Sequence, residues 1–155
     1  MACKLGSRWG AFESRRLPAR PPCGPAVGAY ISQQAELGLV EGCVRETYGA
    51  VLASYQARAA RDPELRGAMS SIARDEAKHA ALSWRIHGWL WPRLSSDERR
   101  AALAAAAGAR GELADRAGEP DAELREVAGL PDAAAGRAML AALDDVVWSK
   151  RLAAA

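Results

Sequence analysis

The chain has 155 residues, half of them hydrophobic, which is enough for a single domain with one core. Its 21 Lys and Arg against 19 Asp and Glu leave a net charge of +2, and no basic run is long enough to follow a nucleic-acid backbone. No apolar run approaches the roughly twenty residues of a membrane span, and the N-terminus lacks a secretory signal. We therefore expect a soluble, cytoplasmic protein with no nucleic-acid partner and no membrane span.

The N-terminal residues differ in composition from the rest of the chain. Residues 1–30 combine arginines with prolines and glycines and have no apolar periodicity, which predicts an irregular or disordered tail. Residues 31–155 are the predicted domain. An alternative hypothesis is that the chain is truncated at its N-terminus, and a lost signal or lipid-attachment segment would then change the compartment.

Helix signals begin after this tail. The hydrophobic residues are mostly Ala, Leu and Val, which is typical of packed helices rather than strands. A helical pattern covers residues 31–61. Asp62, Pro63 and Glu64 then supply an N-cap, a proline at the first helical position and a first-turn acid. They predict a second helix over residues 63–91, which Pro92 ends.

Two further helices are expected. Ser95 and Glu98 have the spacing of a capping box and start a third, Ala-rich helix that reaches about residue 117. Glycines and prolines break the chain over residues 118–131, and Asp132 can cap a fourth helix that reaches about residue 152. Four helices in sequence, the first two joined by a short turn, predict an all-α, antiparallel up-and-down bundle.

The second helix carries ionisable residues in an apolar stripe. Glu76 and His79 lie in the middle of a heptad seam, while Arg74, Lys78 and Arg85 lie on the opposite face. The seam consists of Leu65, Met69, Ile72, Glu76, His79, Ser83, Ile86 and Leu90. An unpaired buried charge is costly, so we expect the carboxylate and the imidazole to be buried with a partner.

The first helix places a carboxylate in a similar stripe. Glu41 shares this stripe with Val44, Tyr48 and Val51, so we expect Glu41 to face Glu76. Glu46 lies about 140 degrees from Glu41 around the helix and ranks second. A divalent metal would satisfy Glu41, Glu76 and His79 together. The alternative is an internal hydrogen-bonded pair, for example Glu41 with a protonated His79.

These residues resemble half of a known carboxylate site. A glutamate (Glu41), a tyrosine two turns later (Tyr48) and Glu76-x-x-His79 on the next helix are similar to the ferritin-like superfamily, in its ferritin and rubrerythrin-type four-helix bundles. The resemblance covers residues 37–90. It implies that Glu41 and Glu76 are carboxylate ligands, that Glu76 bridges two metals, that His79 is the nitrogen ligand and that Tyr48 lies near the site.

The second half of the chain does not repeat this pattern. A complete two-metal site needs another Glu and another Glu-x-x-His, but the fourth helix has no histidine or glutamate. Its candidates are Asp144 and Asp145, and the third helix offers Glu112. We therefore expect a site for iron or manganese that binds one ion or is completed across a homodimer, for Fe(II) oxidation or oxygen chemistry. The alternative is a non-catalytic helical interaction domain with a metal-free site.

The remaining chemistry-bearing residues have structural interpretations. Cys3, Cys23 and Cys43 have no spacing typical of a zinc site or a disulfide framework. His87 lies two turns beyond His79, too far along the helix for the same ion. Three tryptophans crowd the end of the second helix, and we expect them to pack against the third helix or the tail; they are Trp84, Trp89 and Trp91.

Overall fold

The computed structural model describes residues 26–153, and every regular element in that range is helical. The all-α prediction is therefore confirmed for this part of the chain. The first helical stretch is continuous and consists of α1 (Ala26–Leu37), the π-helical segment η1 (Gly38–Glu46) and α2 (Thr47–Ala59). It begins at Ala26, a few residues before the predicted start at Ile31. The rest of the predicted tail lies outside the described residues.

The predicted caps start the next two long helices. The Asp62 carboxylate accepts hydrogen bonds from the backbone N–H of Glu64 (2.7 Å) and Leu65 (3.2 Å), and α3 runs over Pro63–Leu90. A 3-10 turn, η2 (Trp91–Arg93), follows it. Ser95 and Glu98 form the capping box of α4 (Ser96–Arg116).

A short helix lies in the segment that we expected to be broken. Asp121 caps α5 (Ala122–Ala128), and Gly129 ends it with a φ of 65°, in the left-handed region that glycine favours. A Cβ at Gly129 would also collide with the backbone of Ala60, so the end of α5 lies directly on the turn between α2 and α3. This contact stabilises a helix that would be too short to persist alone.

The C-terminal stretch is again continuous. Asp132 accepts from the Ala135 N–H (2.7 Å) and caps α6 (Ala133–Leu143), which continues as the π-helical η3 (Asp144–Trp148) and α7 (Ser149–Ala153). The two π segments meet in the core, where Trp148 Nε1 donates to the Cys43 carbonyl at 3.1 Å. Trp148 is 1% exposed, so this bond is shielded from water.

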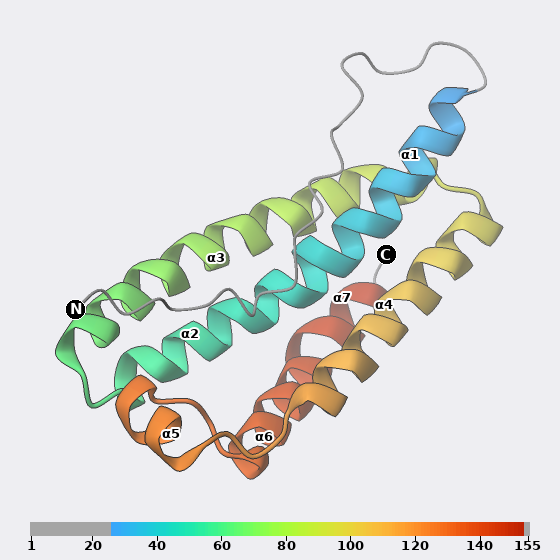
Figure 1. Ribbon diagram of the computed structural model, residues 1–155. Helices are drawn as coiled ribbons and strands as arrows, with labels where there is room; N and C mark the ends of the chain where they lie inside the picture. The colour runs from blue at the N-terminus through green and yellow to red at the C-terminus, as the bar shows by residue number, and fades with distance from the viewer. Residues whose placement is uncertain (1–25, 154–155) are drawn as a thin grey trace.

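The stretch from α1 to α2 lies in the middle of the molecule (Figure 1). α3 runs antiparallel along one side of it, while α4 and the α6–α7 stretch lie along the other side. The extensive contacts of α3 are with η1 and α2 rather than with α4 or α6. The core is therefore centred on η1, whose Leu39, Cys43 and Val44 are fully buried.

Because α3 is an outer helix, its buried stripe is narrow. Two alanines, two aromatic residues and one leucine form that stripe: Ala73, Ala80, Trp84, His87 and Leu90. Ile72, His79 and Ile86, which we placed in a core-facing seam, are exposed. The prediction for these three positions is wrong, because the described helices that contact α3 lie on one side of it.

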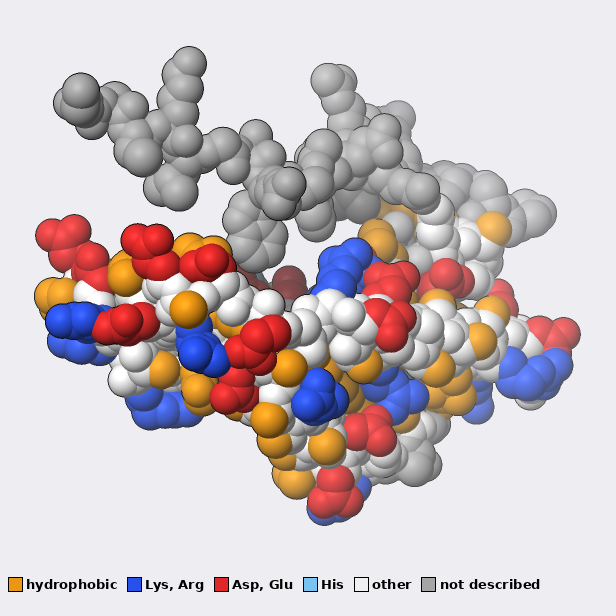
Figure 2. Space-filling view, turned by 60° about the horizontal axis from the view of Figure 1, so that its bottom comes forward, with side chains coloured by type: hydrophobic (Ala, Val, Ile, Leu, Met, Phe, Trp, Pro, Cys, Tyr) orange, Lys and Arg blue, Asp and Glu red, His pale blue; other side chains and the backbone are white. Residues whose placement is uncertain are grey.

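The charged residues are distributed without segregation on the face that Figure 2 shows, where acidic and basic side chains lie next to one another. No helix within residues 26–153 is both long enough and apolar enough to cross a membrane.

Candidate metal centre

Three potential metal ligands come together between η1 and α3. Glu46, the last residue of η1, lies opposite Glu76 and His79 of α3. One ligand atom from each of the three side chains lies within 4.8 Å of the other two. The two glutamates are half-buried and His79 is exposed, so the cluster lies at the surface edge of the hairpin interface.

Glycines on the facing helix allow this close approach. A Cβ at Gly42 would overlap the Cβ and Oγ of Ser83, so η1 and α3 touch there through the bare backbone of Gly42. About two turns further along, a Cβ at Gly49 would lie 3.6 Å from Glu76 Oε2. Glu46 lies between these two glycines on the same face, at i+4 from Gly42 and i−3 from Gly49. The small residues therefore bring the backbones together and leave room for the Glu46 side chain.

The surroundings of Glu46 make its carboxylate unusual. Ser83 Oγ donates to Glu46 Oε2 at 3.3 Å. Burial raises the pKa of Glu46; the positive charge of His79 and the Ser83 hydrogen bond lower it, and the Glu76 charge raises it further. The net effect is a raised pKa, and a cation between the carboxylates would remove the repulsion that contributes to it.

Glu41, which we expected to be the ligand from this helix, does not belong to the cluster. Its Oε1 accepts from Arg45 Nη1 at 2.9 Å, and Arg45 Nη2 also donates to Glu112 Oε2 at 2.7 Å. We predicted the stripe from a rotation of about 100 degrees per residue about the helix axis, as in an α-helix. Hydrogen bonds to the fifth residue widen each turn of η1, so each residue advances by a smaller angle and Glu41 leaves the stripe that Glu46 joins.

The expected burial of His79 is also corrected. Glu76 is half-buried, but the His79 side chain is exposed because no helix within residues 26–153 covers the outer side of α3. The predicted pairing of Glu76 with His79 is present, since both belong to the three-residue cluster.

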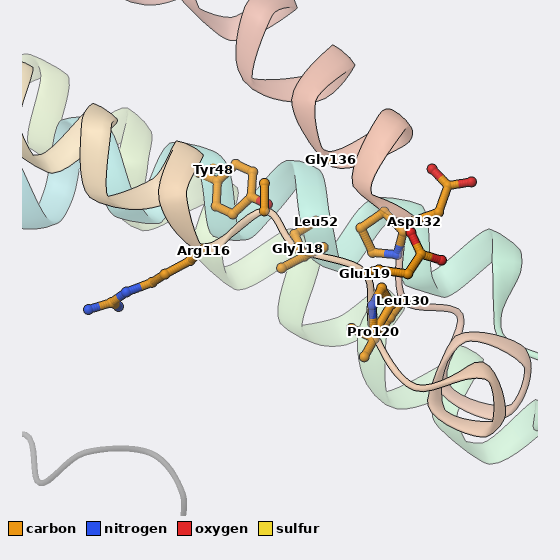
Figure 3. Close-up of a pocket in the computed structure, with 11 residues that line it drawn as sticks. Tyr48, Leu52, Arg116, Gly118, Glu119, Pro120, Leu130, Asp132 and Gly136 are labelled. Atoms are coloured by element: carbon orange, nitrogen blue, oxygen red, sulfur yellow. The ribbon is translucent and has the colours of Figure 1, made fainter.

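Tyr48 does not share this cluster. It lines a cavity of about 260 Å³ between α2, the end of α4 and the start of α6, together with Leu52, Glu119 and Asp132 (Figure 3). Both acids of this cavity are engaged with backbone, because Glu119 Oε2 accepts from the Ala133 N–H and Asp132 caps α6. We therefore assign the cavity no chemistry.

Two of the three second-half candidates are engaged in ion pairs. Glu112 pairs with Arg45, and Asp144 pairs with Arg110. Asp145 is exposed. None of these three acids belongs to the Glu46 cluster. Within residues 26–153, the cluster therefore comes from the first helical hairpin alone.

The sequence did contain a signal for Glu46. The glycines at Gly42 and Gly49 mark a face where two helices approach closely, and Glu46 is the polar residue between them. Small residues, in addition to large apolar ones, therefore indicate which face of this helix meets α3. Comparison with family models, with curated proteins and with solved structures finds no match for the chain.

Proposed function

We propose that Glu46, Glu76 and His79 bind a divalent iron or manganese ion. The observation that carries this proposal is the mutual distance of at most 4.8 Å between the three ligand atoms. Ligand atoms bind first-row metals at about 2.1 Å, so small side-chain rotations suffice to bring all three onto one ion. Carboxylate oxygen together with imidazole nitrogen suits iron and manganese. Iron would supply one-electron redox chemistry with dioxygen, and three protein ligands would leave coordination positions open.

Of the residues that carry the resemblance to the ferritin-like superfamily, Glu76 and His79 belong to the cluster, and Glu46 takes the place of Glu41 in the two-chain site that we propose. Complete sites of this class use a Glu from each of two helices and a Glu-x-x-His from each of two others, within a four-helix bundle. One chain offers half of that set, with Glu46 on one helix and Glu76-x-x-His79 on the next. Two hairpins related by a two-fold axis would supply the full set and four helices.

The outer face of α3 supports the same arrangement. Ile72, Leu82 and Ile86 are each more than 40% exposed, and they flank His79 along the helix. A second copy on this face would cover apolar surface and bury His79 beside its ion. The exposure of His79 in the single chain is then a consequence of a missing partner.

The metal proposal is tested by titrating the purified protein with Fe(II) under anaerobic conditions and with Mn(II). Glu46→Gln and His79→Ala should each weaken binding about tenfold or more, because each removes one ligand. Glu41→Gln is the matched control, since it removes a carboxylate of the same segment that is paired with Arg45. If Glu41→Gln weakens binding as much as Glu46→Gln does, the assignment is wrong.

The two-chain site is tested by sedimentation of the protein with and without Fe(II). We expect the metal to favour the dimer and to bind at two ions per dimer. Ile86→Glu should abolish the dimer, while Leu124→Glu, which alters an exposed leucine of α5, should not. On admission of air, the dimer should oxidise Fe(II), and the Ile86→Glu variant should do so much more slowly.

The exposed apolar face also favours the second candidate, a metal-free helical interaction domain. In that case α3 would associate with a partner whether or not metal is present. A dimer that is equally stable with a chelator and with Fe(II), and that binds no stoichiometric metal, would support this candidate over the first.

A further inference from the structure

The outer face of α3 carries a regular repeat of exposed residues. Seven exposed positions follow one another in alternating steps of four and three, which is the spacing of a coiled-coil seam. We call them the outer seam, and they are Ala68, Ile72, Asp75, His79, Leu82, Ile86 and Trp89. The four large apolar members are 43–57% exposed. The described neighbours of α3 lie on its other side, so the outer seam has room for another helix (Figure 1).

The second copy proposed above fits the outer seam in one antiparallel register. The steps of four and three coincide in two antiparallel copies when the two-fold axis lies beside Ala77. In this register Ile72 packs against Leu82 of the partner subunit. Ile86 packs against Ala68 of the partner subunit. These layers are apolar on both sides of the interface, and only the layers next to the axis are polar.

The two polar members of the outer seam meet in those central layers. His79 lies opposite Asp75 of the partner subunit, and the two-fold axis repeats the pair. A register shifted by one heptad would instead place Asp75 opposite Ile86 and His79 opposite Leu82, which would bury both polar groups without partners. Within its own chain Asp75 pairs with Lys78 at 3.0 Å, but both side chains are exposed, so little stability is lost when that pair opens. Charge complementarity therefore favours the first register.

We infer that Asp75 of the partner subunit accepts a hydrogen bond from the His79 imidazole and orients it towards the metal. The inference rests on the two-chain site proposed above and adds the residue that positions its nitrogen ligand. A histidine that binds metal through one ring nitrogen usually donates the N–H of the other to a carboxylate or a carbonyl. The same register places the Glu76 side chains of the two copies near the axis, where a cation would offset their repulsion.

Disulfide cross-linking tests the register without relying on metal affinity. Ile72→Cys and Leu82→Cys are made as separate chains in a Cys3→Ser/Cys23→Ser background, in which Cys43 is buried. On oxidation with and without Mn(II), we expect a cross-linked dimer from the mixture and none from either variant alone. Each cysteine lies about ten residues, or roughly 15 Å, along the helix pair from its own copy, too far for a disulfide. A parallel pair would cross-link each variant with itself.

Titration with Mn(II) tests the positioning role. Asp75→Asn should weaken binding about tenfold or more, as the loss of a carboxylate behind a histidine ligand does, and Asp75→Glu should restore part of the loss. Asp97→Asn is the matched control, because Asp97 is also an exposed aspartate paired with a basic residue three positions later.

Mixing two variants tests whether Asp75 acts on the other chain. In a mixed dimer of His79→Ala with Asp75→Asn, one site combines the intact His79 of one chain with the intact Asp75 of the other. After subunit exchange, an equal mixture should therefore recover about a quarter of the wild-type sites at wild-type affinity. An Asp75 that oriented His79 within its own chain would recover none.

Three results would each overturn the inference: no cross-linked dimer from the mixed cysteine variants, an Asp75→Asn protein that binds Mn(II) as the wild type does, or no recovered site in the equal mixture. Failure of the proposed function gives a different pattern. The cross-link would form, but the wild-type protein would bind no stoichiometric metal, which would reject the orienting role of Asp75 together with the metal and would confirm the pairing of α3.

Discussion

The contact between Gly42 and Ser83 gives the sharpest test of how the hairpin is built. In the structure a Cβ at Gly42 would overlap both the Cβ and the Oγ of Ser83. The Cβ of Ser83 is fixed to the backbone, so a rotamer change cannot relieve the overlap. We therefore expect Gly42→Ala to push η1 and α3 apart.

The size of the effect follows from two opposing contributions. Overpacking of a close contact costs up to about 3 kcal/mol. Alanine is favoured over glycine within a helix by about 1 kcal/mol, which acts in the opposite direction. The net loss is about 2 kcal/mol of the free energy of unfolding. At roughly 4 °C per kcal/mol, the melting temperature should fall by about 8 °C.

Three matched variants separate the clash from other effects in thermal and urea unfolding. Gly38→Ala, in the same π segment but with open space around its Cβ, should leave stability unchanged or raise it by up to about 1 kcal/mol. Ser83→Gly should restore much of the stability of Gly42→Ala, because it removes both overlapping atoms. Ser83→Ala should not, because the Cβ remains.

The outcome also bears on the metal centre. Separating η1 from α3 moves Glu46 away from Glu76 and His79, so Gly42→Ala should weaken Fe(II) binding even below its melting temperature. A Gly42→Ala protein that melts at or above the wild-type temperature would contradict the close helix contact and, with it, the argument that places Glu46 in the cluster.

Three further predictions concern the same core. Trp148→Phe removes the donor to the buried Cys43 carbonyl and should lower the free energy of unfolding by about 1–3 kcal/mol in urea denaturation, whereas an unchanged value would mean that the bond is absent. Burial, reinforced by the Glu46 charge, raises the pKa of the Cys43 thiol to about 12, so in a Cys3→Ser/Cys23→Ser background a thiol reagent should label Cys43 after unfolding and not before. Burial raises the pKa of Glu46 above its ordinary 4.5, so the Glu46 carboxyl ionises at lower pH in the unfolded chain than in the folded protein. The free energy of unfolding should therefore fall as the pH rises from 4.5 towards neutrality, and Glu46→Gln should remove that fall. Melting curves recorded at several pH values without metal would measure it.

The helix starts could be predicted because their signals are local. Asp62, Ser95 and Asp132 satisfy backbone N–H groups within three residues of themselves, and all three caps are present. α5 was missed although Asp121 caps it, because its seven residues depend on a contact between Gly129 and a distant turn. A helix that short is determined by tertiary packing rather than by its own sequence.

The buried face of α3 could not be deduced from periodicity alone. Ile72, Ile86 and Trp84 all repeat with helical spacing, yet Trp84 is buried and the two isoleucines are exposed. Choosing between the two stripes requires knowing how many neighbours the helix has within its own chain. If the proposed dimer forms, the apolar pattern through Ile72 and Ile86 describes the assembled protein, and the stripe through Trp84 describes the single chain.

The choice between Glu41 and Glu46 depended on the phase of one helix. An uninterrupted α-helix would align Glu41 with Tyr48, and we predicted Glu41 as the ligand on that basis. The π segment η1 changes the phase between α1 and α2, and it ends at Glu46 itself. π turns are rare and often occur at functional sites, because they reorient a side chain that regular geometry would direct elsewhere. Here the same irregular segment buries Cys43 in the core, places Gly42 against α3 and directs Glu46 towards Glu76 and His79, so the position of the candidate ligand and the packing of the hairpin have a common cause.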